Sequence, residues 1–115
     1  MSEAWFTEFS DELARCLVDA RNCAARCEAH LASADGTDGQ GAGRLVDVLA
    51  APAAVSRVLI ELIDQPPQLV LAAVRLCRDL TAAAVEELGP GAPPEVIGAL
   101  RAVCDSAEAL LVAAE

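Results

Sequence analysis

Residues 16–27 read CLVDARNCAARC and contain three of the five cysteines of this 115-residue chain. At about 100° per residue, Cys23 and Cys27 fall about 20° to either side of Cys16 around a helix axis. Cys23 and Cys27 are one turn apart, so their side chains can converge on one atom. Cys16 is about 10 Å from Cys23 along the axis. The stretch therefore predicts a helix that directs a line of thiols to one side.

Apolar residues on both sides of this stretch continue the same helical face. Phe9 and Leu13 precede it in phase and Leu31 follows it, which gives an apolar stripe about 100° wide. The opposite side carries charged and amide side chains, namely Arg15, Asp19, Arg21, Asn22, Arg26 and Glu28. This distribution is typical of a helix that buries one face in a bundle.

Three breaks rich in Gly and Pro divide the chain. They are ADGTDGQGAG at 34–43, DQPP at 64–67 and GPGAPP at 89–94. The segments between them predict helices at approximately 7–33, 43–64, 67–88 and 93–114. Because short connections make neighbouring helices antiparallel, we predict an all-α, up-down-up-down four-helix bundle that forms a single domain over residues 1–115.

Individual residues at these breaks agree with the predicted helix ends. Gly89 is placed to cap the third helix, and Pro67 and Pro94 suit first-turn positions. Within the second segment, Pro52 removes a backbone hydrogen bond and predicts a kink, with a tolerated bend and a ligand cavity as the alternatives. Ser56 lies in the apolar stripe of that segment and is expected to bond to a carbonyl one turn earlier.

The same periodicity predicts inward faces for the last two helices. These faces comprise Leu69, Ala73, Leu76, Cys77, Leu80 and Ala84 in the third helix, and Val96, Leu100, Val103, Cys104, Ala107 and Leu111 in the fourth. The helix midpoints set by the breaks place Cys77 and Cys104 at about the level of Cys16 and Cys23. We therefore expect all five thiols to face inward, four of them around the centre of the bundle.

Composition and charge exclude several classes of function. The chain is 55% hydrophobic and 3% aromatic, which predicts a packed core of Ala, Leu and Val. A formal charge of −10 disfavours nucleic acids and anionic membrane surfaces as partners. Residues 1–13 have neither the basic start nor the apolar run of a secretory signal, so we expect a cytoplasmic protein. No segment reaches about 18 uninterrupted apolar residues, so we expect no membrane span. In that reducing compartment the thiols would stay free.

Two explanations of the inward thiols stay open. Cysteine is a small, frequently buried hydrophobic residue, so the thiols could serve packing alone. Alternatively, thiolates without accompanying carboxylates suit a soft ion, with Cu(I) the first choice. The candidate ligands are Cys16, Cys23, Cys27, Cys77 and Cys104, with His30 as a terminal ligand. The alternative for His30 is a partly exposed ring that interacts with the last carbonyls of its helix.

The helix CLVDARNCAARCEAHL (16–31), followed by three more of similar length, resembles the bacterial copper storage proteins, which are four-helix bundles lined by many cysteines. The chain looks like a cysteine-poor, divergent member of that family. The resemblance implies Cu(I) held by thiolate pairs inside the bundle, with oligomers common. Cys23 and Cys27 match the family's C-x₃-C pair, and the other three cysteines match single positions. The family's Met-lined entrance is missing, since the only Met is residue 1, so we expect a reduced capacity.

The sequence leaves two functions to compare. The first is a cytosolic Cu(I)-binding bundle of reduced capacity. The second is a cysteine-depleted paralogue that acts as a protein-interaction or structural module. Its contact would be Trp5, Phe6 and Phe9, which are all the aromatic residues of the chain and could equally plug one end of the bundle. An enzyme is not favoured, because there is one His and no evident nucleophile–base pair or phosphate-binding loop.

Overall fold

The computed structural model describes residues 9–34, 40–62, 64–89 and 92–114. Within these ranges the chain forms four α-helices and no β-strand. The helices are α2 (Ser10–Ala34), α3 (Gln40–Glu61), α4 (Pro67–Leu88) and α5 (Pro94–Ala114). Their bounds differ by at most three residues from the predicted ones. The predicted all-α, four-helix architecture is confirmed.

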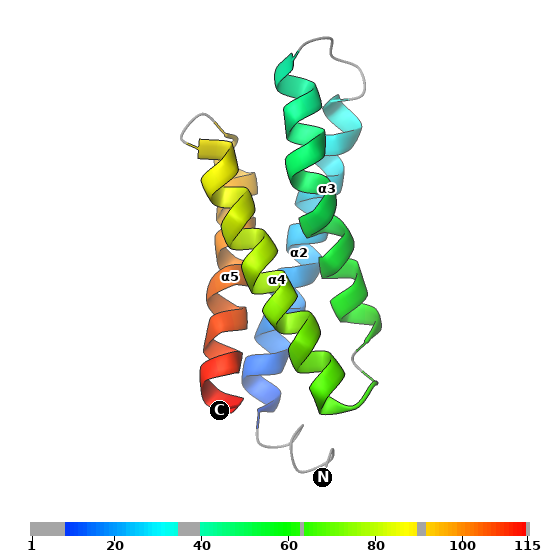
Figure 1. The fold of residues 1–115 in the computed structure, drawn as a ribbon, viewed down its shortest axis with the longest axis vertical. Helices are drawn as coiled ribbons and strands as arrows, with labels where there is room; N and C mark the ends of the chain where they lie inside the picture. The colour runs from blue at the N-terminus through cyan, green and yellow to red at the C-terminus, as the bar shows by residue number, and fades with distance from the viewer. Residues whose placement is uncertain (1–8, 35–39, 63, 90–91, 115) are drawn as a thin grey trace.

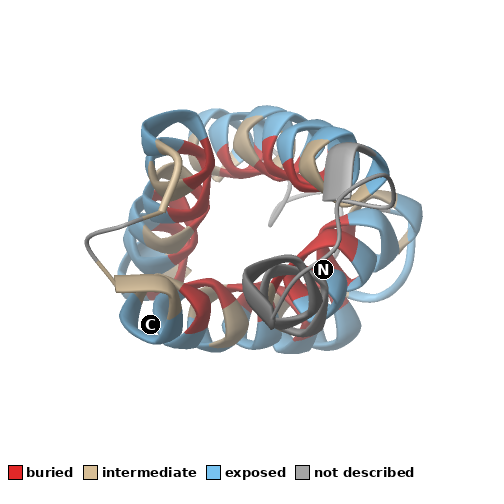
Figure 2. Ribbon diagram, turned by 90° about the horizontal axis from the view of Figure 1, so that it is seen from above, coloured by how far each residue is buried: buried red, intermediate tan, exposed pale blue. Residues whose placement is uncertain are grey.

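The four helices are arranged in a closed ring around the bundle axis, and the molecule extends 51 Å along its longest axis. Consecutive helices run in opposite directions, so α2 begins and α5 ends at the same end of the bundle (Figure 1). Helix α2 packs against α3 and α5, and α4 packs against the same two helices from the other side. Viewed down the bundle, the buried residues line the inner wall of the ring (Figure 2). None of these four helices is long and apolar enough to span a membrane.

Proline and glycine set the helix ends as predicted. Helix α4 follows Pro66 and has Pro67 in its first turn, where a missing N–H costs no hydrogen bond. Gly89 ends the same helix with a φ of 68° and donates its N–H to the Val85 carbonyl. A positive φ is disfavoured for residues with a Cβ atom, so glycine is the residue suited to this position.

The inward face of α4 differs from the predicted one. Its buried residues are Val70, Ala73, Val74, Cys77, Thr81 and Ala84. Leu69 and Leu76, which were predicted to lie in the core, are 49% and 50% exposed. The helix can turn Thr81 inward because the Thr81 hydroxyl donates to the Cys77 carbonyl at 2.6 Å. A buried hydroxyl that is satisfied within its own helix carries little penalty.

The inward face of α5 also differs from the predicted one, as if the helix were rotated about its axis. Ala99, Ser106 and Leu110 join the predicted residues in the core, and the Ser106 hydroxyl donates to the Ala102 carbonyl at 2.9 Å. This rotation moves Cys104 to the edge of the buried face, where its side chain is partly exposed. The prediction that all five thiols face inward is therefore wrong for Cys104.

Helix α3 continues without interruption through Pro52, whose ring is buried. A surface groove of about 330 Å³ beside Pro52 lies between α3 and α4. The predicted hydrogen bond of Ser56 to its own helix is wrong. The Ser56 hydroxyl is completely buried and has no hydrogen-bond partner of good geometry within the part of the chain that the structure describes.

The aromatic end of the chain is described only in part. Phe9 is partly buried and packs against the core of the bundle, an arrangement that fits a plug better than an exposed contact. Trp5 and Phe6 lie outside the described residues.

Candidate metal centre

Four of the five thiols lie inside the bundle. Cys16, Cys23 and Cys27 on α2 and Cys77 on α4 have no exposed surface. All five cysteines are free, and Cys104 is the partly exposed one. The line of three thiols on α2 is buried as predicted, because the helix presents one continuous face to the core.

Cys23 and Cys27 form the one close thiol pair among the described residues, with their Sγ atoms 4.0 Å apart. Two metal–sulfur bonds of about 2.3 Å placed end to end would span about 4.6 Å. A small adjustment of the two side chains would therefore admit an ion between them.

The same pair is badly placed for a disulfide. Residues one helical turn apart have Cβ atoms about 5–6 Å apart, whereas a disulfide needs about 3.8 Å. Closing the S–S bond would thus require α2 to unwind locally. The geometry favours a shared ion or two free thiols over a redox couple.

Each sulfur of this pair alters the ionisation of the other. A hydrogen bond from the Cys27 thiol lowers the pKa of Cys23, against the opposing effect of burial, and the nearby Ser56 hydroxyl lowers it further. The same hydrogen bond to Cys23, together with burial, raises the pKa of Cys27. Cys23 therefore gives up its proton more readily than Cys27, and an ion that takes both sulfurs as ligands would displace both protons.

Cys77 is held as a neutral thiol on the facing helix. Its Sγ lies 3.6 Å from the Val55 carbonyl of α3 and donates to it. Burial raises the pKa of Cys77 to about 12, and negative charge at Cys16 and Cys23 raises it as well. A carbonyl oxygen accepts from a thiol but repels a thiolate, so Cys77 is a poor third ligand in this arrangement.

Cys16 is separated from the pair along α2 and has its own environment. Burial raises the pKa of Cys16 to about 11, although the Ser106 hydroxyl acts in the opposite direction. A rise of about 10 Å separates it from Cys23 along the helix. Cys16 therefore does not complete a site with Cys23.

Cys104 and His30 lie at the periphery of the bundle. Burial and the Asp105 carboxylate raise the pKa of Cys104. The His30 ring is partly exposed, and its Nε2 lies 3.2 Å from Oε1 of Glu95 on α5. The structure thus pairs His30 with a carboxylate of another helix, an arrangement that neither of the alternatives for His30 included.

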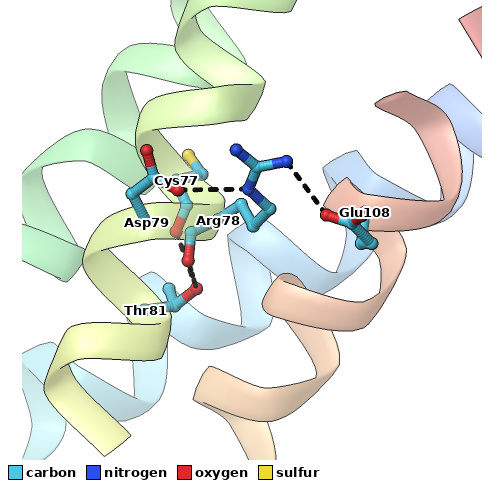
Figure 3. Close-up of polar contacts among 5 residues, drawn as sticks. All are labelled: Cys77, Arg78, Asp79, Thr81 and Glu108. Carbon is cyan, nitrogen blue, oxygen red and sulfur yellow. Dashed lines mark hydrogen bonds and ion pairs between the residues drawn. The ribbon is translucent and has the colours of Figure 1, made fainter. Parts of the chain in front are cut away.

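Ion pairs on the outer surface link neighbouring helices. Arg78 on α4 binds Asp79 at 3.1 Å and Glu108 on α5 at 3.0 Å (Figure 3). Figure 3 also shows the hydrogen bond from the Thr81 hydroxyl to the Cys77 carbonyl. Arg57 on α3 makes a two-pronged contact with Glu28 on α2, at 3.0 and 2.7 Å. Exposed pairs contribute little stability, but a bidentate contact fixes geometry.

One residue of this centre, Ser56, was not among the site residues predicted from the sequence. Ser56 lies beside Cys23 in the core and influences its ionisation. The signal was present, since Ser56 is a polar residue within an apolar stripe. The prediction instead assigned its hydrogen bond to the helix backbone.

The centre offers two converging sulfur ligands and no more. Across the described ranges, no group of three or more His, Cys, Asp or Glu side chains could hold a metal ion. Comparisons with protein-family models, with curated proteins and with solved structures gave no match. The resemblance to copper storage proteins therefore rests on the sequence pattern alone.

Proposed function

We propose that the protein binds one soft ion, with Cu(I) the first choice, between Cys23 and Cys27 inside the bundle. The observation that carries this proposal is the 4.0 Å separation of the two sulfur atoms. Thiolate ligands select soft ions such as Cu(I). Two ligands suit Cu(I) better than Zn²⁺, which takes four in structural sites.

The surroundings of the other thiols support a low capacity. Cys77 is engaged with the Val55 carbonyl, Cys16 is distant along α2, and Cys104 is at the edge of the core. One ion per chain is therefore the expected stoichiometry. A cytoplasmic location is part of the same proposal, and so is the homo-oligomer that the resemblance implies.

An anaerobic titration of the reduced protein with Cu(I), in competition with a chelator, tests this function. We expect one tightly bound equivalent. The variant Cys23→Ala/Cys27→Ala should lose it, because both ligands are removed. The matched control Cys16→Ala/Cys77→Ala, which removes two equally buried thiols, should keep it.

The control also separates the proposal from its alternatives. Equal loss of the ion in both double variants would place it elsewhere in the core. No uptake by the wild type at micromolar protein would contradict Cu(I) binding and leave packing as the role of the thiols. The interaction module would then be the better hypothesis, although Phe9 packs inward.

A further inference from the structure

Three hydroxyl side chains are buried in the described core, and they differ in one respect. The Thr81 hydroxyl donates to the Cys77 carbonyl at 2.6 Å, and the Ser106 hydroxyl donates to the Ala102 carbonyl at 2.9 Å. Ser56 is as deeply buried as Thr81, but its Oγ has no such partner among the described residues. A buried polar group without a partner is rare and calls for a physical explanation.

The position of Ser56 is fixed by contacts on both sides of it in the sequence. Arg57 makes its bidentate contact with Glu28, the residue that follows Cys27 on α2. Val55 accepts the hydrogen bond of Cys77 from α4. These two contacts hold this turn of α3 between α2 and α4. The Ser56 hydroxyl on this turn is close enough to the Cys23 sulfur to lower the pKa of that thiol.

We propose that Ser56 is a positioning residue of the Cys23–Cys27 centre, whose hydroxyl donates a hydrogen bond to the Cys23 sulfur when the two cysteines hold an ion. This inference rests on the proposed function. A thiolate ligand keeps negative charge on sulfur and accepts hydrogen bonds, whereas a neutral thiol is a weak acceptor. The hydroxyl that lacks a partner in the metal-free fold gains one in the bound state.

Ser56 should differ from an ordinary packing residue, because removal of its hydroxyl has opposite effects on the metal-free and the metal-bound protein. In the metal-free protein the unpaired hydroxyl is a cost, so its removal should leave stability unchanged or raise it. In the bound protein the hydroxyl orients and stabilises a ligand, so its removal should weaken binding. Groups that support metal ligands typically change affinity by about 10–100-fold.

The test compares Ser56→Ala with Ser106→Ala, a matched change at a serine whose hydroxyl already has a backbone partner. Each variant is titrated with Cu(I) against a chelator, and its thiolate-to-Cu(I) charge-transfer absorption is recorded. We expect Ser56→Ala to bind at least about tenfold more weakly. Its band should move to lower energy, because the ligand sulfur loses a hydrogen bond. Ser106→Ala should keep the affinity and the band of the wild type.

Urea unfolding of the metal-free variants completes the experiment. The midpoint should be unchanged or higher for Ser56→Ala and unchanged or lower for Ser106→Ala. Wild-type binding with an unaltered affinity and band in Ser56→Ala would overturn the role of Ser56 and leave the proposed function intact. Absence of Cu(I) uptake by the wild type would instead refute the proposed function, and the role of Ser56 with it.

Discussion

The reduced, metal-free protein is expected to lose several kcal/mol of stability as the pH rises from about 9 to about 12. The chain has no Tyr, and its eight basic residues are all Arg. Lys and Tyr are the groups that normally titrate with the thiols at these pH values, and Arg stays protonated throughout. Alkaline unfolding therefore reports on the cysteines alone.

The direction of the change follows from the buried thiols. The pKa of Cys16 rises from 9.0 to about 11 and that of Cys77 from 9.0 to about 12, mainly through burial. Below about pH 9 the folded and the unfolded states both keep these protons, and the contribution of the two thiols to stability is fully present. Above that value the unfolded chain loses them first, so the free energy of unfolding falls as the pH approaches the folded-state values. At about 1.4 kcal/mol per pKa unit, the full losses are roughly 3 and 4 kcal/mol.

Urea unfolding at several pH values between about 8 and 12, under a reductant, measures this loss. In the variant Cys16→Ala/Cys77→Ala the decline should be shallower, because two thiols with raised pKa values are gone. The decline that remains is expected from Cys27 and Cys104, whose pKa values are also raised. A wild type and a variant whose stabilities fall in parallel would show that these thiols are ionised as easily in the fold as in the unfolded chain.

The fold was predictable from local signals, and its helix rotations were not. Glycine and proline mark helix ends without reference to the rest of the molecule, and Gly89 ends α4 as its sequence position indicated. The face that a helix turns inward depends on its neighbours. Periodicity favoured Leu76 on α4, but hydrogen bonds within the helices allow Thr81 and Ser106 to face the core.

The candidate site likewise has one part that the sequence predicted and one part that it did not. The closeness of Cys23 and Cys27 is a property of one helix, so their spacing alone predicted it. The placement of Ser56 depends on the register of α3 against α2, which the contact between Arg57 and Glu28 helps to fix. The spacing of residues along the chain does not determine the register of one helix against another.

Substitution of two leucines would measure how α4 and α5 are turned. Periodicity placed Leu76 and Leu100 alike in the core, but Leu100 is completely buried and Leu76 is 50% exposed. Leu100→Ala should lower the free energy of unfolding by about 2–5 kcal/mol, because it removes apolar contacts and leaves a cavity. Leu76→Ala should change it by less than about 1 kcal/mol, since much of that side chain is already in water.

Urea unfolding of the two reduced variants at neutral pH gives both values, and the two substitutions remove identical groups from helices of similar length. The difference between them therefore isolates burial from side-chain chemistry. Comparable losses in the two variants would mean that α4 presents the Leu76 face inward. That rotation would turn Val70 and Val74 away from the core and alter the position of Cys77. The leucine pair thus tests the helix orientation on which the arrangement of the thiols depends.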